Sequence, residues 1–86
     1  MTVIDFNETE IQITSVYFRK NQTEHKLESY PKRMLLGGRE YNFLEQSARY
    51  LLQKGQELFD VTDGQTAYRL RHSDSRWTLV DMKAVA

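Results

Sequence analysis

Residues 33–43 read RMLLGGREYNF, and this stretch decides much of the fold. Gly37 and Gly38 tolerate the positive φ angles that a two-residue hairpin turn requires. Counting outward from this turn pairs Met34 with Tyr41 and sorts the apolar side chains onto one face of both strands. The turn and the alternation therefore demand the same register, which predicts a β-hairpin. The apolar face of this hairpin collects Met34, Leu36, Tyr41 and Phe43.

The segment before the hairpin is also typical of β structure. Residues 11–19 are rich in β-branched and aromatic types, which favour a strand. Alternation blurs near Val16, so we expect either burial of both faces or a β-bulge there. The polar residues 20–26 are expected to form a loop, after which the strand resumes over 26–30. Pro31 has no N–H to donate and is expected at an edge or a strand boundary.

After the hairpin the apolar spacing changes to that of a helix. Leu44, Ala48 and two later leucines follow intervals of three and four residues. Gly55 stands where a helix commonly ends in a left-handed residue. We therefore expect one helix over about 43–54. The alternative is one long strand over 39–50.

The last third of the chain predicts a three-stranded meander. Residues 57–62 and 66–71 alternate on either side of Asp63-Gly64, a strong hairpin dipeptide. A third alternating run, 76–82, follows a two- or four-residue loop. The inward face of the meander collects Phe59, Val61, Tyr68, Leu70, Trp77 and Leu79.

Two pairings follow from these turns. The first turn places Phe59 opposite Tyr68. The second places Leu70 opposite Trp77. We therefore expect Trp77 to be largely buried, with its indole N–H bonded to a partner.

Together these elements predict an α+β domain. Five to six antiparallel strands form a bent sheet or a small, partly open barrel, with one helix over about 43–54 and a C-terminal meander. The whole chain, 1–86, is expected to be a single domain. Residues 1–10 are acidic and are expected to be a poorly ordered lead-in.

Composition excludes several classes of function. Twelve Lys and Arg residues balance twelve Asp and Glu residues, which argues against a dedicated duplex-DNA binder or a polybasic membrane anchor. Cysteine is absent, so disulfides and thiolate chemistry are excluded. No basic-apolar leader and no apolar run of about 18 residues occurs, so we expect a cytoplasmic protein without membrane contact.

No constellation of residues predicts catalysis or a metal site. His72, Ser73 and Asp74 are the residue types of a hydrolytic triad, but a contiguous tripeptide in a predicted loop cannot converge as one. Asp60 and Asp63 lack the spacing and the twelfth-position glutamate of a calcium loop. We therefore predict no enzyme activity, no catalytic residue, no cofactor and no metal ion.

Two classes of function remain. The first is a small non-enzymatic interaction module that presents a sheet face or edge to a protein partner. The alternative is binding of RNA or single-stranded nucleic acid through a basic sheet face. That face carries Arg69, Arg71 and Arg76, with Arg71 directly opposite Arg76. A solvated face balanced by Asp60 and Asp74 is the plainer interpretation of the same arginines.

Overall fold

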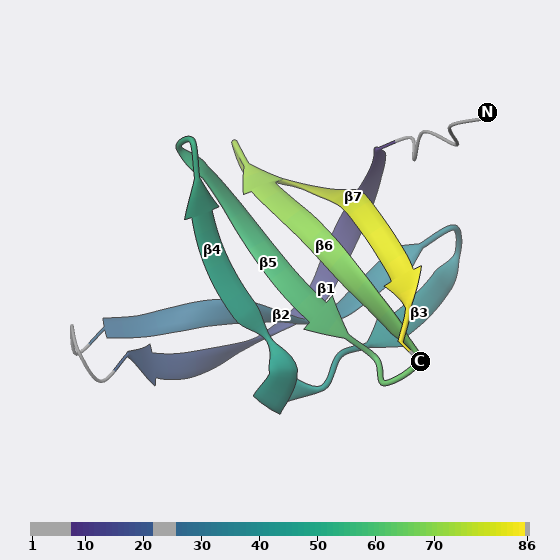
Figure 1. Ribbon diagram of the computed structural model, residues 1–86, viewed down its shortest axis with the longest axis horizontal. Helices are drawn as coiled ribbons and strands as arrows, with labels where there is room; N and C mark the ends of the chain where they lie inside the picture. The colour runs from purple at the N-terminus through teal and green to yellow at the C-terminus, as the bar shows by residue number, and fades with distance from the viewer. Residues whose placement is uncertain (1–7, 22–25, 86) are drawn as a thin grey trace.

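The computed structural model describes residues 8–21 and 26–85, which form one antiparallel sheet of seven strands (Figure 1). The strands are β1 Thr9–Asn21, β2 Lys26–Leu36, β3 Arg39–Asn42, β4 Arg49–Gln53, β5 Gln56–Thr62, β6 Thr66–Ser73 and β7 Arg76–Ala84. Their order in the sheet is β3-β2-β1-β7-β6-β5-β4. β3 and β4 are therefore the two edges of the sheet.

The sheet curls into a half-barrel because β1 changes partner along its length. Residues 9–11 pair with β7, whereas the remainder of β1 pairs with β2. Figure 1 shows the β1–β2 hairpin crossing the wall that β4, β5, β6 and β7 form. The β1–β2 hairpin and this wall are in contact, because the ring of Tyr30 in β2 packs edge-on against Phe59 in β5, with 5.8 Å between the ring centroids.

The predicted α+β class, with five to six strands and one helix, is wrong. The described residues contain seven strands, and their helical content is one short 3-10 helix, η1, Glu45–Ser47. The α-helix predicted over 43–54 does not form, because this segment holds η1 and the edge strand β4. The predicted C-terminal meander is present, and β4 extends it to four consecutive antiparallel neighbours.

The predicted helix gives way to a hairpin because the same residues also satisfy a two-residue period. Ala48 is buried, and Tyr50 lies directly opposite the core residue Phe59. Lys54 and Gly55 have φ angles of 52° and 78°, so they form the tight turn from β4 to β5. Pairing with β5 satisfies backbone groups of β4 and outweighs the weak helix propensity of so short a segment.

The hairpin predicted from Gly37 and Gly38 is confirmed. These glycines have φ angles of 59° and 80°, and Met34 pairs with Tyr41 as expected. Met34 is fully buried and Phe43 nearly so. Turn chemistry and apolar alternation agreed here, and the structure follows both.

The blurred alternation in β1 is a β-bulge, as one of the two interpretations predicted. The register against β2 shifts on both sides of Ser15. Pro31 pairs with Val16 at this irregularity and is buried inside β2, so it does not lie at a strand boundary. It precedes the residues of β2 that pair with β3, so it lies in a part of β2 that is an edge, which is the other place predicted. A bulge tolerates proline because the ladder of hydrogen bonds is already interrupted there.

Two predicted segments lie partly outside the described residues. The lead-in predicted over 1–10 enters β1 at Thr9, and residues 1–7 lie outside. β1 and β2 both reach into the loop predicted over 20–26, of which residues 22–25 lie outside. The β1–β2 hairpin is therefore longer than the sequence predicts.

The registers predicted within the C-terminal meander are wrong by two residues. Phe59 lies opposite Leu70 rather than Tyr68. Trp77 lies opposite His72 rather than Leu70. Each of these side chains nevertheless keeps its predicted face, because the strand pleat repeats every two residues.

The core lies on the concave face of the half-barrel. Tyr68 packs against Tyr41 and Phe43, so the short strand β3 and its connection cover one end. Nearer the other end, the rings of Phe59 and Trp77 lie 5.2 Å apart. Aromatic rings thus run along the whole concave face, where they carry much of the burial. The buried core cluster consists of Ile11, Tyr30, Met34, Phe43, Ala48, Phe59, Val61, Tyr68, Leu70 and Leu79.

Candidate ligand-binding site

The predicted basic face lies on the outer side of the sheet, where acidic residues form ion pairs with two of its three arginines. Arg69 donates two hydrogen bonds to Asp60, from Nε to Oδ1 at 2.7 Å and from Nη2 to Oδ2 at 2.9 Å. Arg71 forms an ion pair with Glu8 at 2.6 Å. Arg76 is exposed. The three arginines share one face, but two of them are already paired with a carboxylate.

The predicted face-to-face pair of Arg71 and Arg76 is wrong. Arg71 lies opposite Thr78. Arg76 lies opposite Ser73, nearer the turn. Elsewhere on this face opposite charges alternate from strand to strand, which favours strand pairing more than attraction of a polyanion. This charge row consists of Arg49, Asp60, Arg69 and Asp81.

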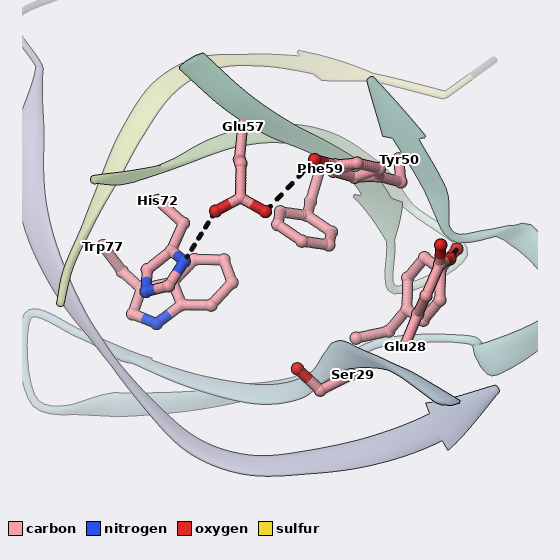
Figure 2. A pocket seen from close by; sticks show the side chains of 8 residues that line it. Glu28, Ser29, Tyr50, Glu57, Phe59, His72 and Trp77 are labelled. Carbon is pink, nitrogen blue, oxygen red and sulfur yellow. Dashed lines mark hydrogen bonds and ion pairs between the residues drawn. The ribbon is translucent and has the colours of Figure 1, made fainter. Parts of the chain in front are cut away.

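A cavity of about 250 Å³ opens on the concave face, near the end where the β4–β5 and β6–β7 turns lie. Figure 2 shows its side chains converging from two facing parts of the chain. We call this cavity the mouth pocket. Its lining residues are Glu28, Ser29, Tyr30, Tyr50, Glu57, Phe59, His72 and Trp77.

Two walls enclose the mouth pocket. Glu57, His72 and Trp77 lie directly opposite one another on β5, β6 and β7, so strand pairing sets their spacing on the first wall. The facing wall is β2, which contributes Glu28 and Ser29 (Figure 2). The curl of the sheet is what brings these segments together, because β2 and β5 are not neighbours in it.

Glu57 is the polar centre of the mouth pocket. Its Oε2 accepts a hydrogen bond from the Tyr50 hydroxyl at 3.1 Å, and its Oε1 lies 3.6 Å from Nδ1 of His72. On the facing wall, the Tyr30 hydroxyl donates to Oε2 of Glu28 at 3.0 Å. Each wall therefore carries one carboxylate that a phenol holds in place.

The two phenols favour their protonated form. Burial raises the pKa of Tyr30, and the hydrogen bond to Glu28 raises it further. Burial likewise raises the pKa of Tyr50, together with the hydrogen bond to Glu57. Both hydroxyls thus remain donors at neutral pH, because a phenolate here would face a carboxylate.

Aromatic rings provide much of the remaining pocket surface. His72 stacks on Trp77, with ring centroids 4.4 Å apart and an angle of 21° between the planes. Phe59 contacts the rings of Tyr30, Tyr50 and Trp77. Trp77 is only half-buried, and its N–H has no hydrogen-bond partner among residues 8–21 and 26–85. The predicted hydrogen bond from the indole N–H is therefore wrong, whereas the ring itself packs, partly buried, against the core cluster.

The mouth pocket was not predicted from the sequence, although one signal for it exists. The sequence places His72 in a loop, whereas it belongs to β6 and faces Trp77. Glu57 shares the inward phase of Phe59, so alternation alone assigns a carboxylate to the core face. An acid in a core position is uncommon and marks a candidate site. The sequence contains no such signal for Glu28, because only the curl of the sheet brings this residue of β2 to the mouth pocket.

Catalytic residue types line the mouth pocket without forming a nucleophile–base pair. Ser29 and His72 lie on facing walls, and the described structure contains no hydrogen bond between them. Glu57 is hydrogen-bonded to Tyr50 and faces the imidazole. The geometry therefore provides fixed polar groups and ring surfaces, which are elements of a binding site.

Three further observations bear on the chain as a whole. The segments that the structure describes contain no group of three or more His, Asp and Glu residues able to hold a metal ion. No helix within those segments has the length and apolar character needed to cross a bilayer. Comparison with protein-family models, with curated proteins and with solved structures finds no match to this chain.

Proposed function

We propose that the protein is a small cytoplasmic interaction module, not an enzyme, and that the mouth pocket is its binding site. The concave face of the half-barrel is then the sheet face that meets the partner. The observation that carries this proposal is the convergence of two carboxylates and several aromatic rings on one open cavity. Mostly apolar walls with a few fixed polar groups are typical of ligand sites.

Exposure of the rings supports this location. Phe59 and Tyr30 are buried, whereas Tyr50 and Trp77 at the same pocket are partly exposed. Leu52 pairs with Glu57 and is 65% exposed. Rings that serve only the core gain most from full burial, whereas partly exposed Tyr and Trp residues are typical of binding surfaces.

The size of the mouth pocket limits what enters it. Sites for drug-sized molecules occupy about 300–1,000 Å³. The mouth pocket, at about 250 Å³, falls just below that range. It suits one side chain of a protein partner or the head group of a small molecule, while the rest of the ligand remains outside.

The nucleic-acid alternative has weaker support. Arg69 and Arg71 already pair with Asp60 and Glu8. A phosphate would have to replace those carboxylates, which reduces the gain from binding. Arg76 remains exposed, but one arginine provides little affinity for a polyanion.

Amide chemical-shift mapping tests the proposal. We would titrate ¹⁵N-labelled protein with a mixture of small neutral, anionic and cationic fragments, and separately with a mixed-sequence RNA oligonucleotide at low salt. We expect the fragments to shift the signals of Glu57, His72 and Trp77. The outer charge row serves as the internal control and is expected to remain unchanged.

Two outcomes would contradict this assignment. The first is fragment shifts that avoid the mouth pocket and gather on another surface. The second is RNA-dependent shifts at Arg71 and Arg76 that weaken steeply with salt, which would instead favour the nucleic-acid alternative.

A further inference from the structure

We infer that the open edge of β4 binds an extended segment of a partner protein as an additional strand of the sheet. The segment carries apolar residues opposite Leu52 and Tyr50 and an acidic residue opposite Arg49. This inference rests on the proposed role as an interaction module, and it adds a second surface beside the mouth pocket. Three features carry it: the backbone of β4, its exposed side chains and the charge of Arg49.

The backbone of β4 is paired along one side only. β4 is the last strand in the order of the sheet and the outermost strand of the wall in Figure 1. In an antiparallel ladder every second pair exchanges hydrogen bonds, beginning with the pair that flanks a two-residue turn, here Gln53 and Gln56. The N–H and C=O groups of Tyr50 and Leu52 therefore point away from β5. Within the part of the chain that the structure describes, these groups have no hydrogen-bond partner.

One contact closes this edge at its beginning. Nη1 of Arg19 donates to the backbone oxygen of Ala48 at 3.1 Å, two residues before Tyr50. The carbonyl group of Ala48 is thus occupied, whereas those of Tyr50 and Leu52 are open. An added strand would therefore pair along Arg49–Gln53 and end opposite Arg49.

The exposed side chains are the second feature. Natural sheets usually shield an edge strand with charged residues, a proline or a bulge. After Arg49, β4 reads YLLQ, with neither charge nor proline, and its register with β5 is regular. Leu52 is 65% exposed, and Tyr50 and Leu51 are partly exposed. The opposite edge strand, β3, is four residues long and carries Arg39 and Glu40.

The charge of Arg49 is the third feature, and it selects the partner. Arg49 begins the charge row, in which the sign alternates from β4 to β7. Its neighbour Asp60 is held by Arg69 through hydrogen bonds of 2.7 Å and 2.9 Å. Arg49 is exposed and forms no ion pair with a residue that the structure describes. An acidic residue of the added strand, opposite Arg49, would continue the alternation.

β5 provides the template for the partner. It runs antiparallel to β4 and places Phe59 opposite Tyr50 and Asp60 opposite Arg49. A strand of the same direction on the open side would read apolar, any residue, apolar, acidic, beginning opposite Leu52. A second copy of β4 fits less well. Paired antiparallel over its full length, it would place glutamine opposite Arg49 and leave the charge without a partner.

The test uses a short peptide with this pattern, acetyl-TVTFDT-amide, and the same peptide with asparagine in place of aspartate. We would titrate each into ¹⁵N-labelled protein and follow the amide signals. We expect shifts at Leu51, Leu52 and Gln53. The aspartate peptide is expected to bind about two- to fivefold more tightly than the asparagine peptide, and added salt is expected to reduce this preference.

Methylation of peptide nitrogens separates strand addition from contact between side chains. The valine and phenylalanine of the peptide would lie opposite Leu52 and Tyr50 and exchange hydrogen bonds with them. Methylating either nitrogen is therefore expected to weaken binding about tenfold or more. The nitrogen of the threonine between them points away from β4, so methylating it is the matched control and is expected to have a much smaller effect.

Two variants test the role of the charge. Arg49→Gln is expected to bind the aspartate and asparagine peptides equally. Arg76→Gln removes another exposed arginine of the outer face, in β7, and is expected to keep the preference for aspartate. Circular dichroism of each variant establishes that it is folded.

Each outcome decides the inference. Shifts along β4 with a preference for aspartate that Arg49→Gln abolishes support it. Equal binding of both peptides by the wild type, or equal effects of all three methylations, overturns it. Shifts at Leu52 that depend on protein concentration without peptide assign the edge to a second copy and also overturn it. If fragments bind the mouth pocket while the peptide leaves β4 unchanged, the inference fails alone; if neither binds, the proposed function fails with it.

Discussion

The imidazole of His72 lies stacked on the indole of Trp77, 4.4 Å away, because the two residues are directly opposite each other on β6 and β7. This pair forms one side of the mouth pocket. Trp77 therefore belongs both to the sheet and to the candidate site, and the two roles predict different consequences of its removal.

Trp77→Ala is expected to cost less stability than Leu70→Ala. Leu70 is fully buried, and its truncation is expected to cost about 2–5 kcal/mol. Trp77 is only partly buried and packs at the margin of the core, so its truncation is expected to cost about 1–2 kcal/mol. Urea denaturation of both variants measures the difference. An equal or larger cost for Trp77→Ala would show that its ring belongs to the sealed core.

Asp63 is expected to make stability depend on acid. Burial acts to raise the pKa of this carboxyl, but the N–H groups of Thr66 and Gln65 outweigh burial and hold the pKa below its usual value. The folded state therefore prefers the carboxylate, and this contribution is complete above the unfolded pKa of about 3.9. It is lost as the pH falls through the lower pKa of the folded state.

Asp63→Ala tests that expectation. The variant is expected to lose about 1–2 kcal/mol at neutral pH and to show a weaker decline of stability in acid. Glu40→Ala, at an exposed position of β3, is the matched control and is expected to keep the wild-type profile. Identical acid profiles for Asp63→Ala and the wild type would exclude this role.

Alkali is expected to destabilise the fold through its tyrosines. Burial raises the pKa of Tyr17, Tyr30, Tyr50 and Tyr68 above the usual value, so the folded state holds these protons more tightly than the unfolded chain. The resulting stabilisation is complete below about pH 10 and declines as the pH rises through the higher values of the folded state. Melting temperatures between pH 8 and 12, with absorbance at 295 nm, measure it. A melting temperature independent of pH in that range would contradict the prediction.

Replacing Gly37 and Gly38 with valine is expected to damage the fold. A Cβ atom at either position would have no neighbour within 4 Å, so steric space is not the limit. The limit is the backbone, because φ angles of 59° and 80° cost a β-branched residue about 1–3 kcal/mol each. Gly37→Asn is the control, since asparagine tolerates this conformation. Unchanged stability of the double valine variant in thermal denaturation would contradict the role of the turn.

The sequence predicts the parts of this fold in which turn and alternation agree. The Gly37-Gly38 hairpin is such a case, because a pair of glycines at positive φ permits only one register for Met34 and Tyr41. Strand faces in the meander are predicted as well, since a register error of two residues keeps every side chain on its face.

Predictions fail where a side chain changes the length of a turn. Asp63 accepts the N–H groups of Gln65 and Thr66, which widens the expected two-residue turn until Thr62 pairs with Ala67. The next turn falls at Asp74 and Ser75, both at positive φ, one residue later than a tight turn in the predicted register. The position of this second turn places His72 opposite Trp77, and these two residues form one side of the candidate site, which the predicted register therefore missed.

The helix prediction fails for another reason. The segment from Leu44 to Gly55 fits both a helical and a two-residue period, and local spacing does not choose between them. Pairing of β4 with β5 decides the outcome, and that pairing depends on a strand later in the chain. The mouth pocket needs this pairing too, because Tyr50 reaches Glu57 from β4.

The change of partner along β1 makes the half-barrel a clamp. β1 leaves β7 after the Ile11–Trp77 pair, so this pair joins the two arms of the half-barrel, which are the β1–β2 hairpin and the wall of β4 to β7. Within the described residues, the arms are held apart near the mouth pocket by rings, with Tyr30 of one resting on Phe59 of the other. The aperture is therefore set by side-chain volume, and exchanging one ring for a smaller one alters which ligand fits without breaking a strand pair.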